Sequence, residues 1–128
     1  MANTREKKLQ CIVSTSLNRQ EKESLIDVSR KLDIPYCNIT RQLIRYFLQG
    51  QLVWLDLFEK TNDCIEPLDK SKKVPLRTTL TPELYMSFVQ FVERKGSTTS
   101  VVLRRLILLY ITGQIEWKTI WSTREGPQ

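Results

Sequence analysis

The side chains that most often carry out chemistry near neutral pH are scarce in this sequence. It has no histidine, the commonest general base and a frequent metal ligand, so serine–histidine, cysteine–histidine and histidine–zinc sites are excluded. The three cysteines, Cys11, Cys37 and Cys64, have no C-x-x-C spacing, which excludes a disulfide framework or a four-cysteine zinc site and predicts free thiols. The acidic residues fall in charge-mixed stretches, where nothing apolar would perturb them. We therefore predict a protein that is not an enzyme and uses no metal or cofactor.

Length and composition predict one compact domain, or two very small ones. The chain has 128 residues, 41% hydrophobic and 27% charged, which is too apolar for a disordered chain. Arg104 and Arg105 precede the longest apolar run, so we expect no membrane span. The N-terminal residues 1–8 are charged and no apolar stretch follows them, so we expect no secretory signal and a cytoplasmic protein. The net charge is +6, and its positive excess lies in residues 1–50 and 74–128 and not in residues 51–73. This distribution favours a polyanionic partner.

One sequence pattern occurs twice, at an offset of 63 residues, the separation of Leu17 and Leu80. Identical pairs are Thr15/Thr78, Leu17/Leu80, Ser24/Ser87, Arg41/Arg104, Leu43/Leu106, Ile44/Ile107, Gly50/Gly113, Gln51/Gln114 and Trp54/Trp117. The repeats span 9–58 and 74–121, and the charged, turn-rich segment 59–73 is interpreted as a linker.

Each repeat predicts a short strand followed by two helices. Residues 11–17 and 74–80 alternate with period two, which places Val13, Thr15 and Leu17 on one face of the first strand. Asn18 with Glu21 resembles a capping box, and Thr81 precedes a proline, so each first helix begins directly after its strand. Second helices are predicted over 36–48 and 99–111, each ended by a glycine.

A strand and two helices are too few residues to bury a core alone, so the two repeats must share one. The predicted fold is mainly α with a short antiparallel β-ribbon, whose inner face covers a four-helix core. The extensions 51–58 and 114–121 alternate in a way that suggests strands, and their aromatic residues Trp54, Trp117 and Trp121 are interpreted as structural. Leu108 and Leu109 make the last predicted helix apolar nearly all round, as in a buried or an oligomeric helix.

The order strand, helix, turn, helix resembles the ribbon-helix-helix DNA-binding family of the MetJ/Arc/CopG type. The second repeat carries the closer resemblance, through 76–83 (LRTTLTPE) and 96–104 (GSTTSVVLR), which is similar to the family's G-x-S-x-S-x-x-x-R segment. In the first repeat Asp33 replaces the turn glycine, and 35–37 (PYC) replaces the usual Ser-x-Ser. Because that family binds DNA as a dimer with intertwined strands, two tandem copies imply a dimer fused into one chain, an intramolecular pseudo-dimer.

The resemblance implies which residues would touch double-stranded DNA. A two-stranded ribbon fits the major groove, and its outward side chains meet base edges. The implied base-reading residues are Ser14, Ser16, Arg77 and Thr79, with Ile12 and Pro75 at the third family position. The N-termini of the second helices would bind phosphate, through Thr98, Thr99 and Ser100 in one repeat and through Tyr36 and Cys37, after Pro35, in the other. Arg41 and Arg104 could also bind phosphate, but an intramolecular role is favoured.

The function implied by the resemblance is sequence-specific DNA binding by a nucleoid-associated transcriptional regulator. Repressors, plasmid copy-control proteins and antitoxins all fit that family. Since one ribbon contacts few base pairs, two chains are expected side by side on DNA. The alternative is a protein-interaction module, or an antitoxin, that keeps the frame as a scaffold and binds a protein partner.

Overall fold

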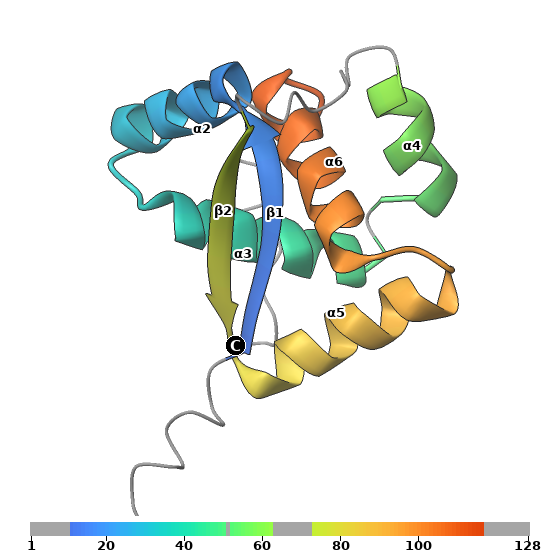
Figure 1. Ribbon diagram of the computed structural model, residues 1–128. Helices are drawn as coiled ribbons and strands as arrows, with labels where there is room; N and C mark the ends of the chain where they lie inside the picture. Colours follow the sequence, from blue (N-terminus) through green and yellow to red (C-terminus); the bar gives the residue numbers. More distant parts are fainter. Residues whose placement is uncertain (1–10, 51, 63–72, 117–128) are drawn as a thin grey trace, which may run out of the picture.

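The computed structural model describes residues 11–50, 52–62 and 73–116 of the chain (Figure 1). In chain order the elements are β1 (Cys11–Asn18), α2 (Arg19–Leu32), α3 (Tyr36–Leu48), α4 (Trp54–Asn62), β2 (Lys73–Leu80), α5 (Pro82–Arg94) and α6 (Thr99–Ile111). The fold is therefore mainly helical with one two-stranded antiparallel sheet, as predicted. None of the described helices has the length and apolar character needed to cross a membrane.

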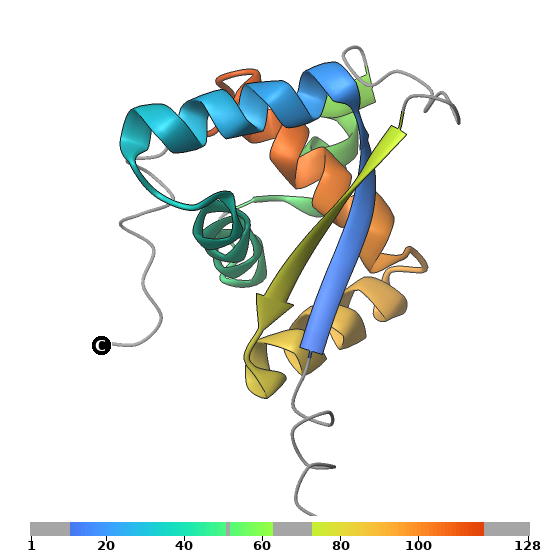
Figure 2. The same cartoon turned by 60° about the vertical axis from the view of Figure 1, so that its left-hand side comes forward.

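The two strands pair along their whole length, with Cys11 opposite Leu80 and Asn18 opposite Lys73. Their period-two pattern sets the faces, because successive side chains point to opposite sides. The inner side chains are all at most 5% exposed: Val13, Thr15, Leu17, Leu76, Thr78 and Leu80. The predicted register of the inner face is thus confirmed. The ribbon lies on one side of the molecule, with the helices behind its inner face (Figure 2).

The helix boundaries follow from local capping. At the start of α2 the backbone N–H of Asn18 donates to Glu21 Oε1 at 2.9 Å, and at the start of α5 the hydroxyl of Thr81 accepts from the N–H of Leu84. Asp33 ends α2 with a φ of 59°, the left-handed conformation that glycine adopts more easily. Asp33 therefore takes the place of the expected turn glycine without changing the turn.

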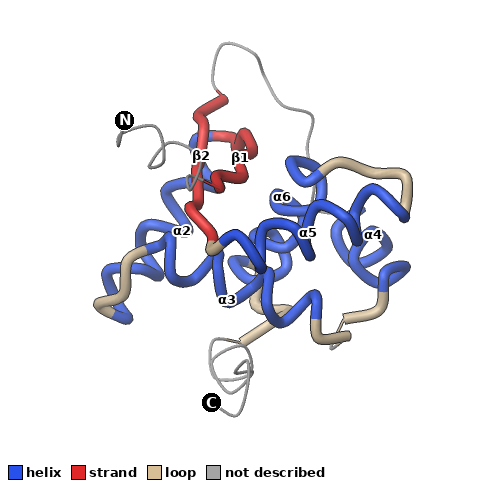
Figure 3. Tube along the Cα trace, turned by 90° about the horizontal axis from the view of Figure 1, so that it is seen from below, coloured by secondary structure: helices blue, strands red, loops and turns tan. Residues whose placement is uncertain are grey.

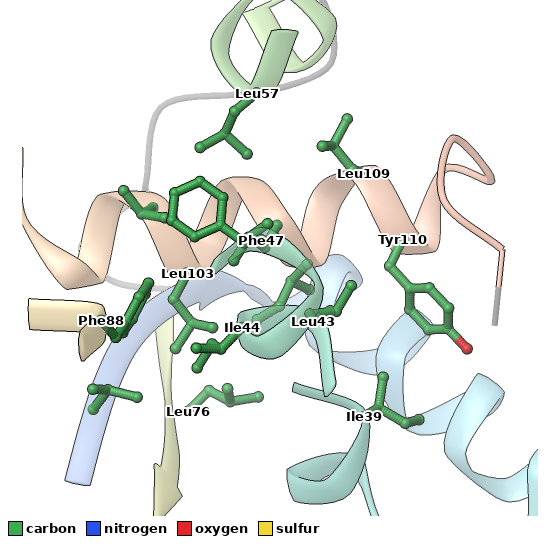
Figure 4. Packing of buried hydrophobic residues seen from close by; sticks show 14 of the residues in the cluster. Ile39, Leu43, Ile44, Phe47, Leu57, Leu76, Phe88, Leu103, Leu109 and Tyr110 are labelled. Atoms are coloured by element: carbon green, nitrogen blue, oxygen red, sulfur yellow. The ribbon is translucent and has the colours of Figure 1, made fainter. Parts of the chain in front are cut away.

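The core lies between the ribbon and the helices and draws on both repeats (Figure 4). Phe47 of α3 packs edge-on against Phe88 and Phe91 of α5, with ring centroids 6.2 and 5.1 Å apart. Strand residues also cross between repeats: Thr78 Oγ1 lies 2.7 Å from Thr40 Oγ1, and Thr15 Oγ1 donates to the Ser100 carbonyl at 2.7 Å. Each strand is therefore bonded to the second helix of the other repeat.

The extension after Gly50 differs from the prediction. Residues 54–62 form the helix α4, not a strand, and α4 runs four residues into the predicted linker. The physical reason is the spacing of Trp54, Leu57, Phe58 and Thr61, which a period near 3.6 brings to one face; Leu57 and Thr61 are fully buried there. The linker residues 63–72 and the second extension from residue 117 lie outside the described residues.

Helix α6 is covered from within the chain by α4, which packs against it and also lies beside α5 (Figure 3), where the ring centroids of Trp54 and Phe91 are 6.4 Å apart. Leu108 and Leu109 are 2% and 0% exposed, so of the two predicted roles the buried one is correct. Arg105 of α6 stabilises the packing of α6 against α4. Its Nη1 donates to the Phe58 carbonyl, to Thr61 Oγ1 and to Asn62 Oδ1 at the C-terminal end of α4. These leucines therefore offer no surface for self-association.

Candidate nucleic-acid interface

The outer face of the ribbon brings the six side chains expected to face DNA into one small area. Five are exposed and Ser16 is half-buried; the set is Ile12, Ser14, Ser16, Pro75, Arg77 and Thr79. Across the ribbon Ser14 pairs with Arg77, Ile12 with Thr79, and Ser16 with Pro75. Opposite residues on one face of an antiparallel pair lie about 5 Å apart, so the six form a single patch. The pairing of the two strands holds them there.

Arg77 occupies the middle of this patch, with one cross-strand pair on either side. Its guanidinium is the only outward group in the patch with a full charge, and its planar fork can donate to O6 and N7 of one guanine together. Serine and threonine hydroxyls accept several bases, and the apolar Ile12, which is 42% exposed, suits a thymine methyl group. The patch therefore contains one side chain that could discriminate strongly between bases, surrounded by side chains that accept several bases.

The N-terminus of α6 carries the hydroxyls expected to bind phosphate, but they have different surroundings. Thr98 is the N-cap, and its Oγ1 accepts from the N–H of Val101 at 3.3 Å. Ser100 is exposed, but its hydroxyl donates to Thr15 Oγ1 of the ribbon at 3.2 Å. Thr99 is half-buried. The Ser100 hydroxyl thus serves the ribbon, and the side chains best placed for an anion at this end are those of Thr98 and Thr99.

The N-terminus of α3 is built differently. Its N-cap is Pro35, which offers no side-chain hydroxyl, and Tyr36 and Cys37 are half-buried. Lys22 of α2 lies beside it, with Nζ 5.6 Å from the centre of the Tyr36 ring and 3.2 Å from the Pro75 carbonyl, to which it donates. The sequence analysis missed Lys22, because its nearness to β2 depends on how the repeats cross and leaves no local signal.

The equivalent arginines Arg41 and Arg104 have unlike environments. Arg104 is 8% exposed and holds Glu21 with two bonds, Nη2 to Oε2 at 2.8 Å and Nε to Oε1 at 3.2 Å. Arg41 is half-buried; its Nε donates to the Thr79 carbonyl at 3.2 Å and its Nη1 to Asn38 Oδ1 at 2.8 Å. Both arginines make bonds within the chain, as expected, but of the two only Arg104 bonds to a carboxylate of the described residues.

Two grooves lie between a first helix of one repeat and the second helix of the other. The larger, about 590 Å³, lies between α3 and α5 and includes Arg45, Leu48, Gln49, Thr81, Glu83, Leu84 and Ser87 in its lining. The smaller, about 170 Å³, lies between α2 and α6 and is lined by Leu108, Ile111, Thr112, Asn18, Gln20, Glu21 and Ser24. These two sets correspond residue by residue at the 63-residue offset of the sequence.

Other chemistry is sparse in the described part of the chain. Cys11 and Cys37 are free thiols there, as predicted, and Cys64 lies outside it. No three His, Cys, Asp or Glu side chains of the described residues gather to hold a metal ion. Burial raises the pKa of the Tyr110 hydroxyl above its usual 10.0. No family model, curated protein or solved structure matches the chain.

Proposed function

We propose that this protein binds double-stranded DNA sequence-specifically as a fused ribbon-helix-helix pseudo-dimer and acts as a transcriptional regulator. The observation that carries the proposal is the outer face of the ribbon, where Arg77 lies among small polar and apolar side chains on an uncovered two-stranded sheet. A major groove about 12 Å wide admits such a ribbon, and one arginine fork on guanine discriminates by about 1 to 3 kcal/mol.

The strand register supports the pseudo-dimer. Ser14 and Arg77 occupy the same position in their repeats, and they are also direct partners across the ribbon. In a symmetric dimer, that self-pairing occurs where the twofold axis passes through the ribbon. The two flanking pairs are related in the same way. Pro75 is the equivalent of Ile12 and Ser16 is the equivalent of Thr79, so exchanging the repeats turns the pair Ile12–Thr79 into the pair Pro75–Ser16.

The crossing contacts support it as well. Every lining residue of the smaller groove has its equivalent in the lining of the larger one, and the threonine bonds join each strand to the second helix of the other repeat. An isologous dimer has each of its contacts twice, related by the axis. The chain resembles this arrangement, because Thr15 and Thr78 hold equivalent strand positions and both bond to the second helix of the other repeat, at the non-equivalent residues Ser100 and Thr40. A consequence for function is that Ser14 and Ser16 lie on one strand and Arg77 and Thr79 on the other, so the site read on DNA is asymmetric.

Selection from a random duplex library tests the proposal. The intact protein and Arg77→Ala are run in parallel at one salt concentration, because phosphate contacts make affinity depend on salt. We expect the protein to enrich a short, non-palindromic motif whose guanine preference is lost in Arg77→Ala. Enrichment of a palindrome would contradict reading by a single asymmetric ribbon, and enrichment of nothing by either protein would refute base reading.

A protein-interaction module is the second candidate, and exposed apolar residues favour it. Val53 and Leu55 are 60% and 64% exposed at the start of α4, on the part of the chain with no counterpart in the basic strand-helix-helix unit. Exposed apolar side chains that lie close together are common at protein interfaces. Such a module would show no salt-dependent binding to DNA, because it would make no phosphate contacts and release no counterions.

A further inference from the structure

Two positively charged side chains of the described residues donate to the edge of β2. Along β2, Lys22 donates to the carbonyl of Pro75 and Arg41 donates to the carbonyl of Thr79. The two carbonyls belong to residues four apart, about 13 Å along the strand. Both contacts are at exposed positions, next to the outer face of the ribbon.

The second repeat does not supply the same two charges at its equivalent positions. The residues equivalent to Lys22 and Arg41 are Tyr85, which is neutral, and Arg104, whose charge is buried against Glu21. The two arginines differ because the residue equivalent to Glu21 is Leu84, so Arg41 finds no carboxylate at the equivalent place. Among the described residues no acidic side chain pairs with Arg41, and the guanidinium reaches instead to the edge of β2.

We infer that Lys22, Arg41 and Asn38 form a phosphate-binding flank along β2, which holds the backbone of one DNA strand and orients the asymmetric ribbon. This inference rests on the proposed DNA binding. Two of the five N–H donors of Arg41 are used within the protein, at Thr79 and Asn38. Since a guanidinium has no acceptor, the Asn38 amide must turn its oxygen to Arg41, which leaves the Nδ2 group to donate to a phosphate oxygen.

The flank also explains how the first repeat could hold phosphate with few hydroxyls. The α6 end offers Thr98 and Thr99, whereas the α3 end has Pro35 as its cap. A lysine and an arginine beside α3 supply full charges there, and charge-assisted bonds to phosphate are about twice as strong as neutral ones. The two sides of the ribbon would therefore hold DNA by different means.

The test compares salt dependences on a random-sequence duplex of about 24 base pairs. The double variant Lys22→Ala/Arg41→Ala is measured beside Arg30→Ala/Lys31→Ala, which removes two exposed charges from the far end of α2. Each lost phosphate contact lowers the slope of log K against log salt by about 0.9, so the flank variant should lose about 1.8. Between 50 and 200 mM salt, the intact protein would then lose affinity about 12-fold more than the flank variant.

The outcomes separate this inference from the proposal on which it rests. If the intact protein binds and the flank variant keeps the slope of the α2 control, the flank is wrong while DNA binding stands. If the intact protein does not bind duplex DNA at any salt concentration, both fail. Lys22→Arg/Arg41→Lys keeps both charges and should keep the slope, and a loss there would mean that the flank acts through ribbon structure. Thermal unfolding of each variant checks that the fold is retained.

Discussion

Replacing Glu21 by leucine tests how much the buried ion pair between Glu21 and Arg104 contributes to stability. Glu21 is 9% exposed, and its two oxygens accept three bonds, two from Arg104 and one from the backbone N–H of Asn18. Removing one member of a buried ion pair costs about 3 to 5 kcal/mol, because the buried charge that remains loses its oppositely charged partner. The lost bond at the start of α2 adds about 1 kcal/mol. We therefore expect Glu21→Leu to lower the free energy of unfolding by about 4 to 6 kcal/mol.

Urea unfolding followed by circular dichroism measures the change, provided that the slope with denaturant stays constant. The double variant Glu21→Leu/Arg104→Met removes both charges and should recover most of the loss, since an apolar replacement of a buried pair is often neutral. The chain offers its own comparison, because Leu84 already stands at the equivalent position and Arg41 there reaches the strand edge. A loss below about 1 kcal/mol for Glu21→Leu would refute the reasoning, since Arg104 would then have escaped burial as Arg41 does.

Three further changes probe other parts of the fold. Thr78→Val removes the donor to Thr40 Oγ1, which itself still donates to the Cys37 carbonyl at 3.0 Å, so unfolding free energy should fall by only about 1 kcal/mol in the same urea assay. Arg105→Ala removes the bonds to the end of α4, and hydrogen exchange should accelerate in α4 more than in α3; equal acceleration in both would contradict a local role. Because the folded pKa of Tyr110 is raised, its unfolded hydroxyl ionises first, so this contribution to stability is present below pH 10 and is lost as pH rises above it. Tyr110→Phe should remove that part of the alkaline loss, and an unchanged pH profile would contradict the assignment.

The strands and most helix boundaries were predictable because each rests on local chemistry. Period-two alternation fixed the buried face of both strands, including Thr15 and Thr78. A proline at the first helical position predicted the start of α5 at Pro82, and a glycine after each second helix, with φ of 80° at Gly50 and 83° at Gly113, predicted where those helices end. The repeat then predicted that these elements share one core.

The strand predicted over 51–58 was wrong because a short apolar run fits either period. Val53 and Leu55 alternate with other residues in a way that suggests a strand, but both lie exposed, outside the buried face of α4. The buried positions become evident only once Leu57 and Thr61 meet α6, a contact made far along the chain. For the same reason the different partners of Arg41 and Arg104, and the place of Lys22 beside β2, needed the tertiary structure.

Titration of isotope-labelled protein with a duplex tests the central claim most directly. Amide resonances are followed while a duplex enriched in the selection is added, or a random-sequence duplex if none is enriched. The account predicts that the largest shifts cluster on the outer face of the ribbon, at Ser14, Arg77 and Thr79, and along the β2 flank at Arg41. Shifts confined to α4 around Leu55, or no shifts at all, would contradict DNA binding by the ribbon.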